Sequence, residues 1–207
     1  MTRPTRRSPE RGDARTRLLE AARDTILAKG FAATTVDDVC RAAEVSKGSF
    51  FHHFKGKQQL GVAVADYWAK TTSAFFAGAP YHAPADPLDR VLAYVAFRRS
   101  IIEGELPEFT CLVGTMAQEV FADQPAIRDA CGASIFGHAA TLEADIQAAI
   151  DAHGVAADAA SLARHTQTVI QGAFVLAKAG NDAALAREGL GHLDRYIRLI
   201  FGRETAQ

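Results

Sequence analysis

The chain has 207 residues, of which 48% are hydrophobic and 23% charged, enough for a sizeable core and one or two domains. No stretch reaches the ~18 apolar residues of a membrane span, and no apolar run follows the basic N-terminus as in a secretory signal. The three cysteines, Cys40, Cys111 and Cys131, are odd in number and far apart, without metal-ligand spacing. We therefore expect a reduced, cytoplasmic protein with no cofactor, no metal site and no membrane partner.

The net charge of −1 hides an uneven distribution along the chain. Residues 1–60 hold 12 Lys and Arg against 7 Asp and Glu, whereas residues 61–207 hold 11 against 17. We expect the basic stretch 1–12 to be a disordered tail. A basic N-terminal part on an acidic body indicates a polyanion partner for that part alone. A solvated imbalance of surface charge would look the same in the sequence.

The first part of the chain predicts three helices separated by clear stop and start signals. Gly30 ends the first helix as a C-cap residue. Thr35 is an N-cap, and Asp38 three residues later gives the second helix a capping-box pattern. Ser46 is a good N-cap for a third short helix, and Gly56 then breaks the chain.

The remainder also has helical spacing, and β-branched runs with period-two alternation are missing. The sequence therefore predicts an all-α protein of about nine helices and no sheet. An interruption is expected at the segment ELPEF. The later helices are expected within residues 57–78, 86–104, 110–123, 124–154, 158–180 and 182–202.

Two short helices joined by a tight turn, the second polar and basic, are typical of a helix-turn-helix. Phe50 and Phe54 are four residues apart, so they share a face and can lock the third helix onto the core. The other face then carries Lys47, Ser49 and Phe51, where a recognition helix meets base edges. The second helix is expected to pack on the first through Val36, Val39, Ala42 and Ala43.

Residues 14–62 resemble the DNA-binding module of the tetracycline-repressor (TetR/AcrR-type) family of transcriptional regulators. The residues that carry the motif are Thr35, Val39, Cys40, Ala43, Glu44, Val45, Ser46, Gly48, Phe51, His53, Phe54, Lys57 and Leu60. The resemblance implies a three-helix helix-turn-helix domain over residues 13–60 and a helical ligand-binding and dimerisation domain over residues 61–207. It also implies a homodimer that represses transcription from a palindromic DNA operator and is released by a small-molecule effector.

Three positions depart from the family's pattern. Phe51 stands where Tyr is usual, so a phosphate-reaching hydroxyl worth ~1 kcal/mol is lost. Glu44 stands where Gly is common in the turn, at a cost of ~1 kcal/mol if that residue is left-handed. Cys40 replaces a usual Ala.

The DNA contacts are expected on the third helix and at two helix starts. Lys55 and Lys57 flank the start of the fourth helix, where an N-terminus and two ammonium groups suit a backbone phosphate. The full set of expected DNA-binding residues is Thr34, Thr35, Ser46, Lys47, Gly48, Ser49, Phe51, His52, His53, Lys55 and Lys57.

The last two helices carry more apolar surface than one core needs, and a helix that is apolar on two faces is buried on two sides. The second side is expected to meet a partner chain, as the resemblance also implies, although an ordinary monomer core would show the same pattern. The expected dimer interface is Leu162, Val169, Ala173, Leu176, Leu190, Leu193, Ile197, Ile200 and Phe201.

The resemblance places a ligand pocket inside the middle helices, and an apolar cavity with few polar groups is the usual ligand site. His165 is considered as a further polar anchor. Each candidate could equally be an ordinary core residue. The expected ligand-binding residues are Trp68, Phe75, Phe97, Ile101, Phe109, Cys111, Leu112, Thr115, Met116, Glu119, Phe136, His138, Gln171 and Phe174.

The residues of the body also bear on two alternative functions. Cys111 begins a helix, whose N-terminus favours the reactive thiolate form, so a redox- or electrophile-sensing repressor is the alternative function. An enzyme is not expected, because the sequence has no nucleophile elbow, phosphate loop or HExxH-type spacing.

Overall fold

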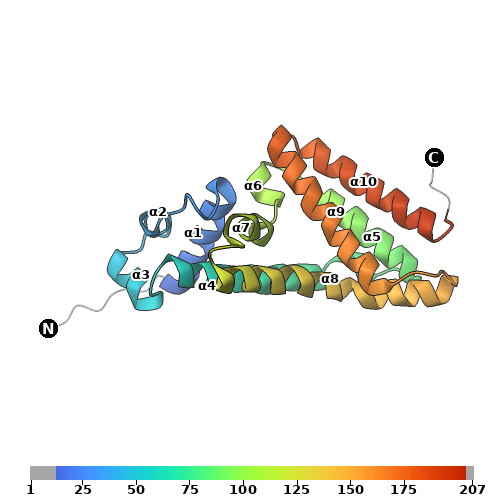
Figure 1. Cartoon of the computed structure of the whole chain (residues 1–207), viewed down its shortest axis with the longest axis horizontal. Coiled ribbons are helices and arrows are strands. Elements are labelled where there is room, and N and C mark those ends of the chain that lie inside the picture. The colour runs from blue at the N-terminus through green and yellow to red at the C-terminus, as the bar shows by residue number, and fades with distance from the viewer. Residues whose placement is uncertain (1–12, 204–207) are drawn as a thin grey trace.

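The computed structural model describes residues 13–203, and within that range it contains helices and no strand. The molecule is elongated, with α1 to α3 at one end and α9 and α10 toward the other (Figure 1). The predicted all-α fold is confirmed. The elements in chain order are α1 (Ala14–Lys29), α2 (Val36–Ala42), α3 (Lys47–His53), α4 (Lys57–Ala77), a 3₁₀ turn η1 (Pro80–His82), α5 (Pro87–Ser100), α6 (Leu106–Phe109), α7 (Leu112–Val120), α8 (Pro125–His153), α9 (Ala159–Gly180) and α10 (Ala183–Ile200).

The structure has one α-helix more than the sequence predicts in this range. The expected interruption at ELPEF is itself a single helical turn, α6, closed by a capping box between Glu105 and Glu108. Pro107 lies in its first turn, where proline does not break a helix. The basic tail predicted over residues 1–12 lies outside the described residues.

The predicted caps of the N-terminal helices are confirmed. Gly30 follows α1 with a φ of 86°, which glycine adopts without strain. The Thr35 hydroxyl accepts from the N–H of Asp38, and the Asp38 carboxylate accepts from the N–H of Thr35. The Ser46 hydroxyl accepts from the N–H of Ser49 at the start of α3. These local bonds fix where each helix begins.

The tight turn between α2 and α3 contains the strained residue that the sequence indicates. Glu44 has a φ of 52°, in the left-handed region that disfavours side chains other than glycine. Val39 and Ala43 pack α2 inward as expected, but Ala42 is exposed and Cys40 takes the buried position. The inward face of α2 is therefore rotated by part of a turn from the predicted one.

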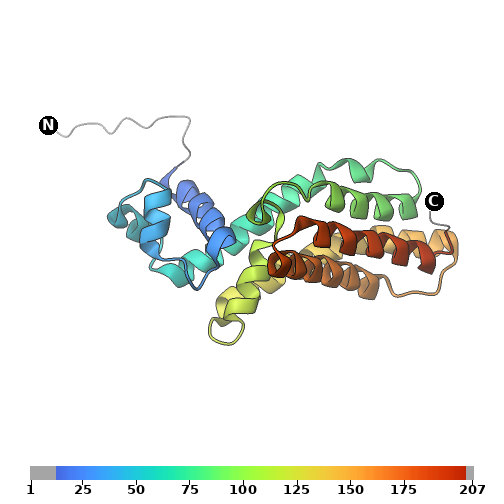
Figure 2. The same cartoon turned by 90° about the horizontal axis from the view of Figure 1, so that it is seen from above.

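The core has two parts. The first unites α1 to α3 with the start of α4, with α7 and with the start of α8, through residues such as Leu60, Met116 and Ile127. The domain boundary predicted after residue 60 lies inside α4, and this core runs across it. Viewed from above, α4 connects the α1–α3 end to the long helices of the body (Figure 2).

The second part of the core lies between α5, α8, α9 and α10. α8 is 29 residues long and ends at Gly154, which is left-handed. The stripe of α10 that we expected at the dimer interface packs into this core, since Leu190, Leu193 and Ile197 are all buried within the single chain. The same holds for Leu162, Ala173 and Phe201, whereas Val169 and Ile200 are partly buried against the core.

Candidate nucleic-acid interface and ligand cavity

α3 is held by aromatic packing on its inner face. Phe50 is fully buried, and Phe54 just after the helix is nearly so. Their ring centroids are 5.6 Å apart, and the Arg15 guanidinium lies over the Phe54 ring at 5.6 Å. Because both phenylalanines face inward, the rest of α3 must face outward.

The outward face of α3 carries polar and aromatic side chains, and no other element of residues 13–203 covers it. Lys47 is exposed, and its ammonium lies 2.7 Å from a carboxylate oxygen of Asp37 on α2. This hydrogen bond raises the pKa of Lys47, so the side chain stays charged. Phe51 is 57% exposed, which is a high exposed fraction for a large apolar side chain.

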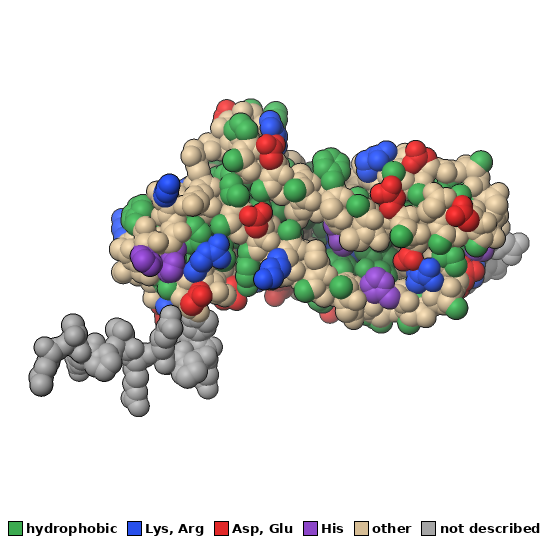
Figure 3. Space-filling model, turned by 90° about the horizontal axis from the view of Figure 1, so that it is seen from below, with side chains coloured by type: hydrophobic (Ala, Val, Ile, Leu, Met, Phe, Trp, Pro, Cys, Tyr) green, Lys and Arg blue, Asp and Glu red, His purple; other side chains and the backbone are tan. Residues whose placement is uncertain are grey.

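The other expected DNA-binding residues on or beside α3 differ in their exposure. Ser46, Gly48 and His52 are exposed on or beside α3, and Ser49 and His53 are half-buried there. Lys55 is exposed beside α3, and its N–H donates to the Gln59 side chain. Cationic and histidine side chains gather at this end of the molecule (Figure 3).

Thr34, Thr35 and Lys57 are turned toward their own chain. Thr34 is buried, and its hydroxyl donates to the carbonyl of Gly30 at 2.7 Å. The Thr35 hydroxyl is engaged in the capping box. The Lys57 ammonium donates to the carbonyl of Ala32 at 3.0 Å and lies over the Phe31 ring. These three side chains hold the module together rather than lining the face around α3.

A cavity of about 270 Å³ lies between α4, α5, α8 and α9, with α6 and the start of α7 forming one wall. Its lining is mostly apolar and aromatic, with a few polar groups, as ligand sites usually are. The expected ligand-binding residues that line it are Trp68, Phe75, Ile101, Phe109, Cys111, His138, Gln171 and Phe174.

Six expected ligand-binding residues lie away from this cavity. Leu112 and Met116 are fully buried in the core that α7 shares with α1 to α3. Phe97 packs against Phe75, Phe76 and Tyr81. Their apolar character serves packing, which a sequence pattern does not distinguish from a cavity wall.

The remaining three face outward or toward another element. Phe136 is exposed on α8. Thr115 accepts from the Lys178 ammonium at 2.6 Å, and Glu119 bonds to the turn after α1. His165 is also exposed, with its ring 4.9 Å from the ring of Tyr196.

Two lining residues of the cavity, His138 and Gln167, are hydrogen-bonded to the buried Tyr94 beside it. The Tyr94 hydroxyl is 2.8 Å from His138 Nε2, and the Gln167 amide donates to the same hydroxyl at 3.3 Å. Burial, together with the charge of Arg98, lowers the pKa of His138 to about 4. His138 is therefore neutral near pH 7 and can act as a donor or an acceptor.

Several cavity residues were missed by the sequence reasoning, and Arg98 is the most important of them. Its guanidinium lies between the rings of Phe76 and Phe174, at 5.0 and 5.7 Å from their centroids. A signal was present, because Arg98 follows the buried Tyr94 by one helical turn on an inward face of α5. The other missed lining residues are Thr72, Phe76, Ile102, Glu108, Thr110, Val113, Ser134, Ile135 and Gln167.

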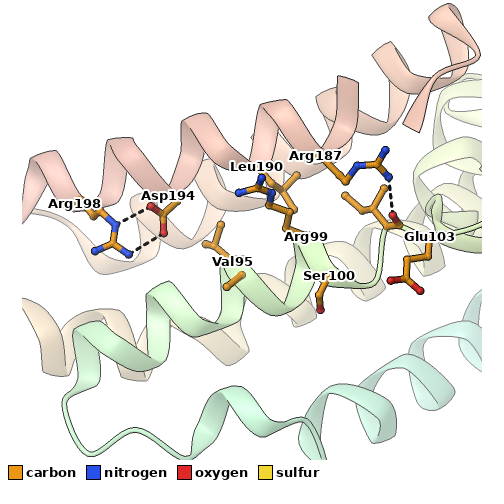
Figure 4. Close-up of a pocket in the computed structure, with 10 residues that line it drawn as sticks. Val95, Arg99, Ser100, Glu103, Arg187, Leu190, Asp194 and Arg198 are labelled. Carbon is orange, nitrogen blue, oxygen red and sulfur yellow. Dashed lines mark hydrogen bonds and ion pairs between the residues drawn. The ribbon is translucent and has the colours of Figure 1, made fainter. Parts of the chain in front are cut away.

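A second, more open groove lies between α5 and α10 (Figure 4). Its cationic side chains mostly have partners in the chain. Arg187 donates to the carbonyl of Ile102 at 2.9 Å, and Arg198 pairs with Asp194 at 2.7 Å. Arg99 also lines this groove and is exposed. The groove therefore resembles an ordinary charged surface more than a ligand site.

α7 connects the cavity to the helix-turn-helix module. At one end, Cys111 and Val113 line the cavity. At the other end, the Glu119 carboxylate accepts from the N–H of Ala32 at 2.7 Å, in the turn between α1 and α2. The Lys57 ammonium donates to the carbonyl of the same Ala32. One peptide segment of the module is thus held from both α7 and α4.

Residues 13–203 show no sign of a metal centre or of a membrane-spanning helix. No group of three or more His, Cys, Asp or Glu side chains is placed to hold a metal ion there. In the same range no helix is long and apolar enough to cross a membrane.

Comparison with known families assigns both halves of the chain. Residues 18–64 match the family model of the tetR family of bacterial regulatory proteins, and residues 87–193 match that of the tetracyclin repressor-like C-terminal domain. The chain belongs to the TetR family. The resemblance stated from the motif residues is thereby confirmed, and TetR-family proteins are DNA-binding transcriptional regulators.

Individual relatives match over part of the chain. The transcriptional regulator AcuR of Cereibacter sphaeroides is 27% identical over 56% of this chain and 53% of its own length. The repressor NemR of Escherichia coli K12 is 33% identical over 40% of this chain and 41% of its own length. The chain thus matches about half the length of these curated relatives.

Solved structures match over nearly the whole chain. A TetR regulator from Chloroflexus aurantiacus is 27% identical, has a TM-score of 0.77 and covers 89% of this chain and 93% of its own. The reduced form of E. coli NemR has a TM-score of 0.75 at 24% identity, covering 91% and 97%. At that identity the NemR structure supports the fold alone.

Proposed function

We propose that this protein is a ligand-responsive repressor that binds a palindromic DNA operator as a homodimer. The observation that carries the proposal is the geometry of α3. Its inner face is fixed by Phe50 and Phe54, and its outer face presents Lys47 and Phe51 to solvent, with Ser49 half-buried beside them. A recognition helix needs this combination of rigid support and free side chains.

The dimer is proposed to form on the outward face of α9 and α10. This face carries large apolar side chains that are exposed. Leu176 is 60% and Leu199 79% exposed, and Val175 and Tyr196 are exposed as well. Of the interface residues expected from the sequence, Leu176 lies on this face. A two-fold axis here would place two copies of α3 on one side of the dimer and match a two-fold operator.

Ligand binding is proposed to act on DNA binding through α4 and α7. Both helices line the cavity, through Trp68 on α4 and Val113 on α7. Both also hold the turn at Ala32, through Lys57 and Glu119. A ligand that favours a different placement of either helix changes the support of the module. It weakens DNA binding by its difference in affinity for the two arrangements.

The test is selection of bound fragments from a pool of random duplex DNA at moderate salt. The expected result is an enriched inverted repeat, with affinity that falls steeply as salt rises. Lys47→Ala should lose the enrichment, whereas the control Lys70→Ala, at an exposed position of α4 away from α3, should keep it. No enriched sequence for the wild type, with the chain folded and dimeric, would contradict the proposal.

A second candidate is a repressor that senses oxidants or electrophiles through Cys111. Its thiol lines the cavity, is partly exposed and accepts from the N–H of Gly114 at 3.4 Å. Cys131 is a matched control, because burial raises its pKa to about 12. Operator release by an electrophile should be lost in Cys111→Ser and kept in Cys131→Ser. Release that survives in Cys111→Ser would exclude this candidate.

The proposed role implies a cytoplasmic protein without catalytic activity. Support comes from the curated relatives AcuR and NemR, which are transcriptional regulators. No bound cofactor is needed for the proposed mechanism, because a change in helix placement is sufficient.

A further inference from the structure

The cavity contains a cation without an anion. Arg98 Nε is buried and has no hydrogen-bond partner, and no ion pair joins Arg98 to any residue of 13–203. Its contacts within that range are the faces of the Phe76 and Phe174 rings. Several other arginines of the body have oxygen partners, as Arg90 has in Asp145 and Arg187 in the carbonyl of Ile102. A guanidinium left in an aromatic cavity is costly unless something pairs with it.

A second unpaired polar atom belongs to another residue that lines the cavity. Thr110 is 2% exposed, and its hydroxyl has no hydrogen-bond partner. Most buried polar atoms in folded proteins are hydrogen-bonded, so each exception calls for an explanation. Only one other buried side-chain atom of the described residues lacks a partner, Arg17 Nε, and the guanidinium to which it belongs donates to the carbonyl of Ala43.

The carboxylate of the cavity lining is hydrogen-bonded to the backbone of α6. Glu108 lines the cavity, but its carboxylate accepts from the N–H of Glu105 at 2.6 Å and closes the capping box of α6. It forms no ion pair with Arg98. The neutral side chains around Arg98, including His138 and Gln171, can donate hydrogen bonds but supply no negative charge.

We propose that the cavity binds a small, mostly apolar carboxylate, whose carboxyl group is held by the Arg98 guanidinium and the Thr110 hydroxyl. This inference rests on the proposed function, because it names the chemical class of the effector. Arg98 offers the forked donors that recognise a carboxylate. Trp68, Phe75 and Phe109 provide an apolar wall for the remainder of the molecule.

The size and charge of the cavity narrow the class further. A volume of about 270 Å³ equals that of about nine water molecules at ~30 Å³ each, so the ligand has on the order of ten non-hydrogen atoms. One guanidinium balances one negative charge, and the Glu108 carboxylate in the lining disfavours a second. A monocarboxylate therefore fits better than a phosphate monoester.

The test compares acids with neutral molecules of the same shape. Octanoate and 3-phenylpropanoate, with octanamide and 3-phenylpropanamide as partners, are titrated into the full chain by calorimetry. Each acid is expected to bind at least about tenfold more tightly than its amide, the effect of one charge-assisted hydrogen bond. Equal binding of acid and amide, or no binding of either acid, would overturn the inference.

Variants then assign the preference to particular residues. Arg98→Met should remove the preference for acids, Arg98→Lys should keep part of it, and Arg99→Met, on the next residue of α5, should behave as wild type. An acid preference that survives in a folded Arg98→Met variant would overturn the assignment. Should Arg98→Met fail to fold, the comparison of acid with amide on the wild type still decides the ligand class.

Thr110→Val gives a second test, and its expected outcome differs from that of a residue with a purely structural role. Because valine removes an unpaired buried hydroxyl, the free protein should gain thermal stability, while affinity for the acid falls about fivefold for the loss of one hydrogen bond. Loss of both stability and affinity would count against a ligand contact.

Operator binding, measured separately on the free protein, distinguishes two kinds of failure. If the chain binds an operator but no acid, the proposed function stands and the inference about the ligand is wrong. If the chain binds acids but no operator, the inference about the ligand stands and the proposed function is wrong.

Discussion

Arg17 in the module and Arg98 in the body both have a buried Nε without a partner. In the module, the same guanidinium also donates to the carbonyl of Ala43 and so ties α1 to the end of α2. In the body, Arg98 contacts aromatic rings and has no hydrogen bond to an oxygen within residues 13–203. The Arg17 guanidinium thus has an oxygen partner within the chain, and the module presents its exposed side chains outward. The cavity has an unbalanced charge that a second molecule can balance.

The difference shows that the two parts carry function in opposite ways. DNA binding needs side chains that are exposed on a rigid surface, and Lys47 and Phe51 satisfy that need on α3. Ligand binding needs an enclosed space whose polar groups remain unsatisfied until the ligand arrives, as Arg98 and Thr110 do. The unpaired groups cost folding stability, on the order of 1–3 kcal/mol for each.

The largest expected effect tests whether the apolar stripe of α10 belongs to the core of the single chain or to the dimer interface. Ile197 on α10 is fully buried, so Ile197→Asp should destabilise the chain by about 4 kcal/mol through a buried, unpaired charge. Leu199→Asp, two residues on and 79% exposed, should change stability by less than ~0.5 kcal/mol and weaken the dimer. Urea unfolding and sedimentation measure the two effects. A stable, monomeric Ile197→Asp variant would place the dimer interface on the inner face of α10.

The next effect concerns His138, which lines the cavity. Burial lowers its pKa to about 4, against about 6.5 for an exposed histidine. As pH falls, the unfolded chain takes up this proton first, so stability is lost between about pH 6.5 and pH 4, by ~3 kcal/mol in total.

The pH dependence is measured by urea unfolding at a series of pH values. His138→Gln should flatten the loss over this range, because glutamine can still bond to Tyr94 but does not titrate. A bound carboxylate beside Arg98 should also reduce the loss, since its charge favours the protonated histidine. An equally steep loss in the His138→Gln variant would show that other groups control acid stability.

A smaller effect is expected at the surface of the module. Lys47→Ala should weaken specific operator binding by ~1–3 kcal/mol if the ammonium reaches a base edge, with little change in the stability of the free protein. Asp37→Asn is an informative companion, because it releases Lys47 from its present ion pair and should strengthen DNA binding. Titrations at several salt concentrations measure both. Unchanged affinity in Lys47→Ala would remove this residue from the interface.

The sequence predicts well what local bonds decide. Thr35, Asp38 and Ser46 set helix starts within four residues of chain, and the structure confirms these caps. It predicts poorly what distant partners decide. Ile197 is apolar whether its neighbour is α5 of the same chain or a second chain, and only the packed body shows which. Arg98 was missed for the same reason, because an arginine on a helix is ordinarily solvated and its aromatic neighbours come from α4 and α9.

The smallest effect is expected in the turn between α2 and α3. Glu44 has a φ of 52°, which costs ~1 kcal/mol for a residue with a side chain, and Glu44→Gly should recover part of that. The net gain should stay below ~1 kcal/mol, because glycine also increases the freedom of the unfolded chain. Glu44→Ala is the matched control, since alanine keeps the strain while removing the rest of the side chain. Glycine should therefore be the more stable of the two variants in urea unfolding. Equal stability of the two variants would show that the turn relaxes away from the left-handed conformation.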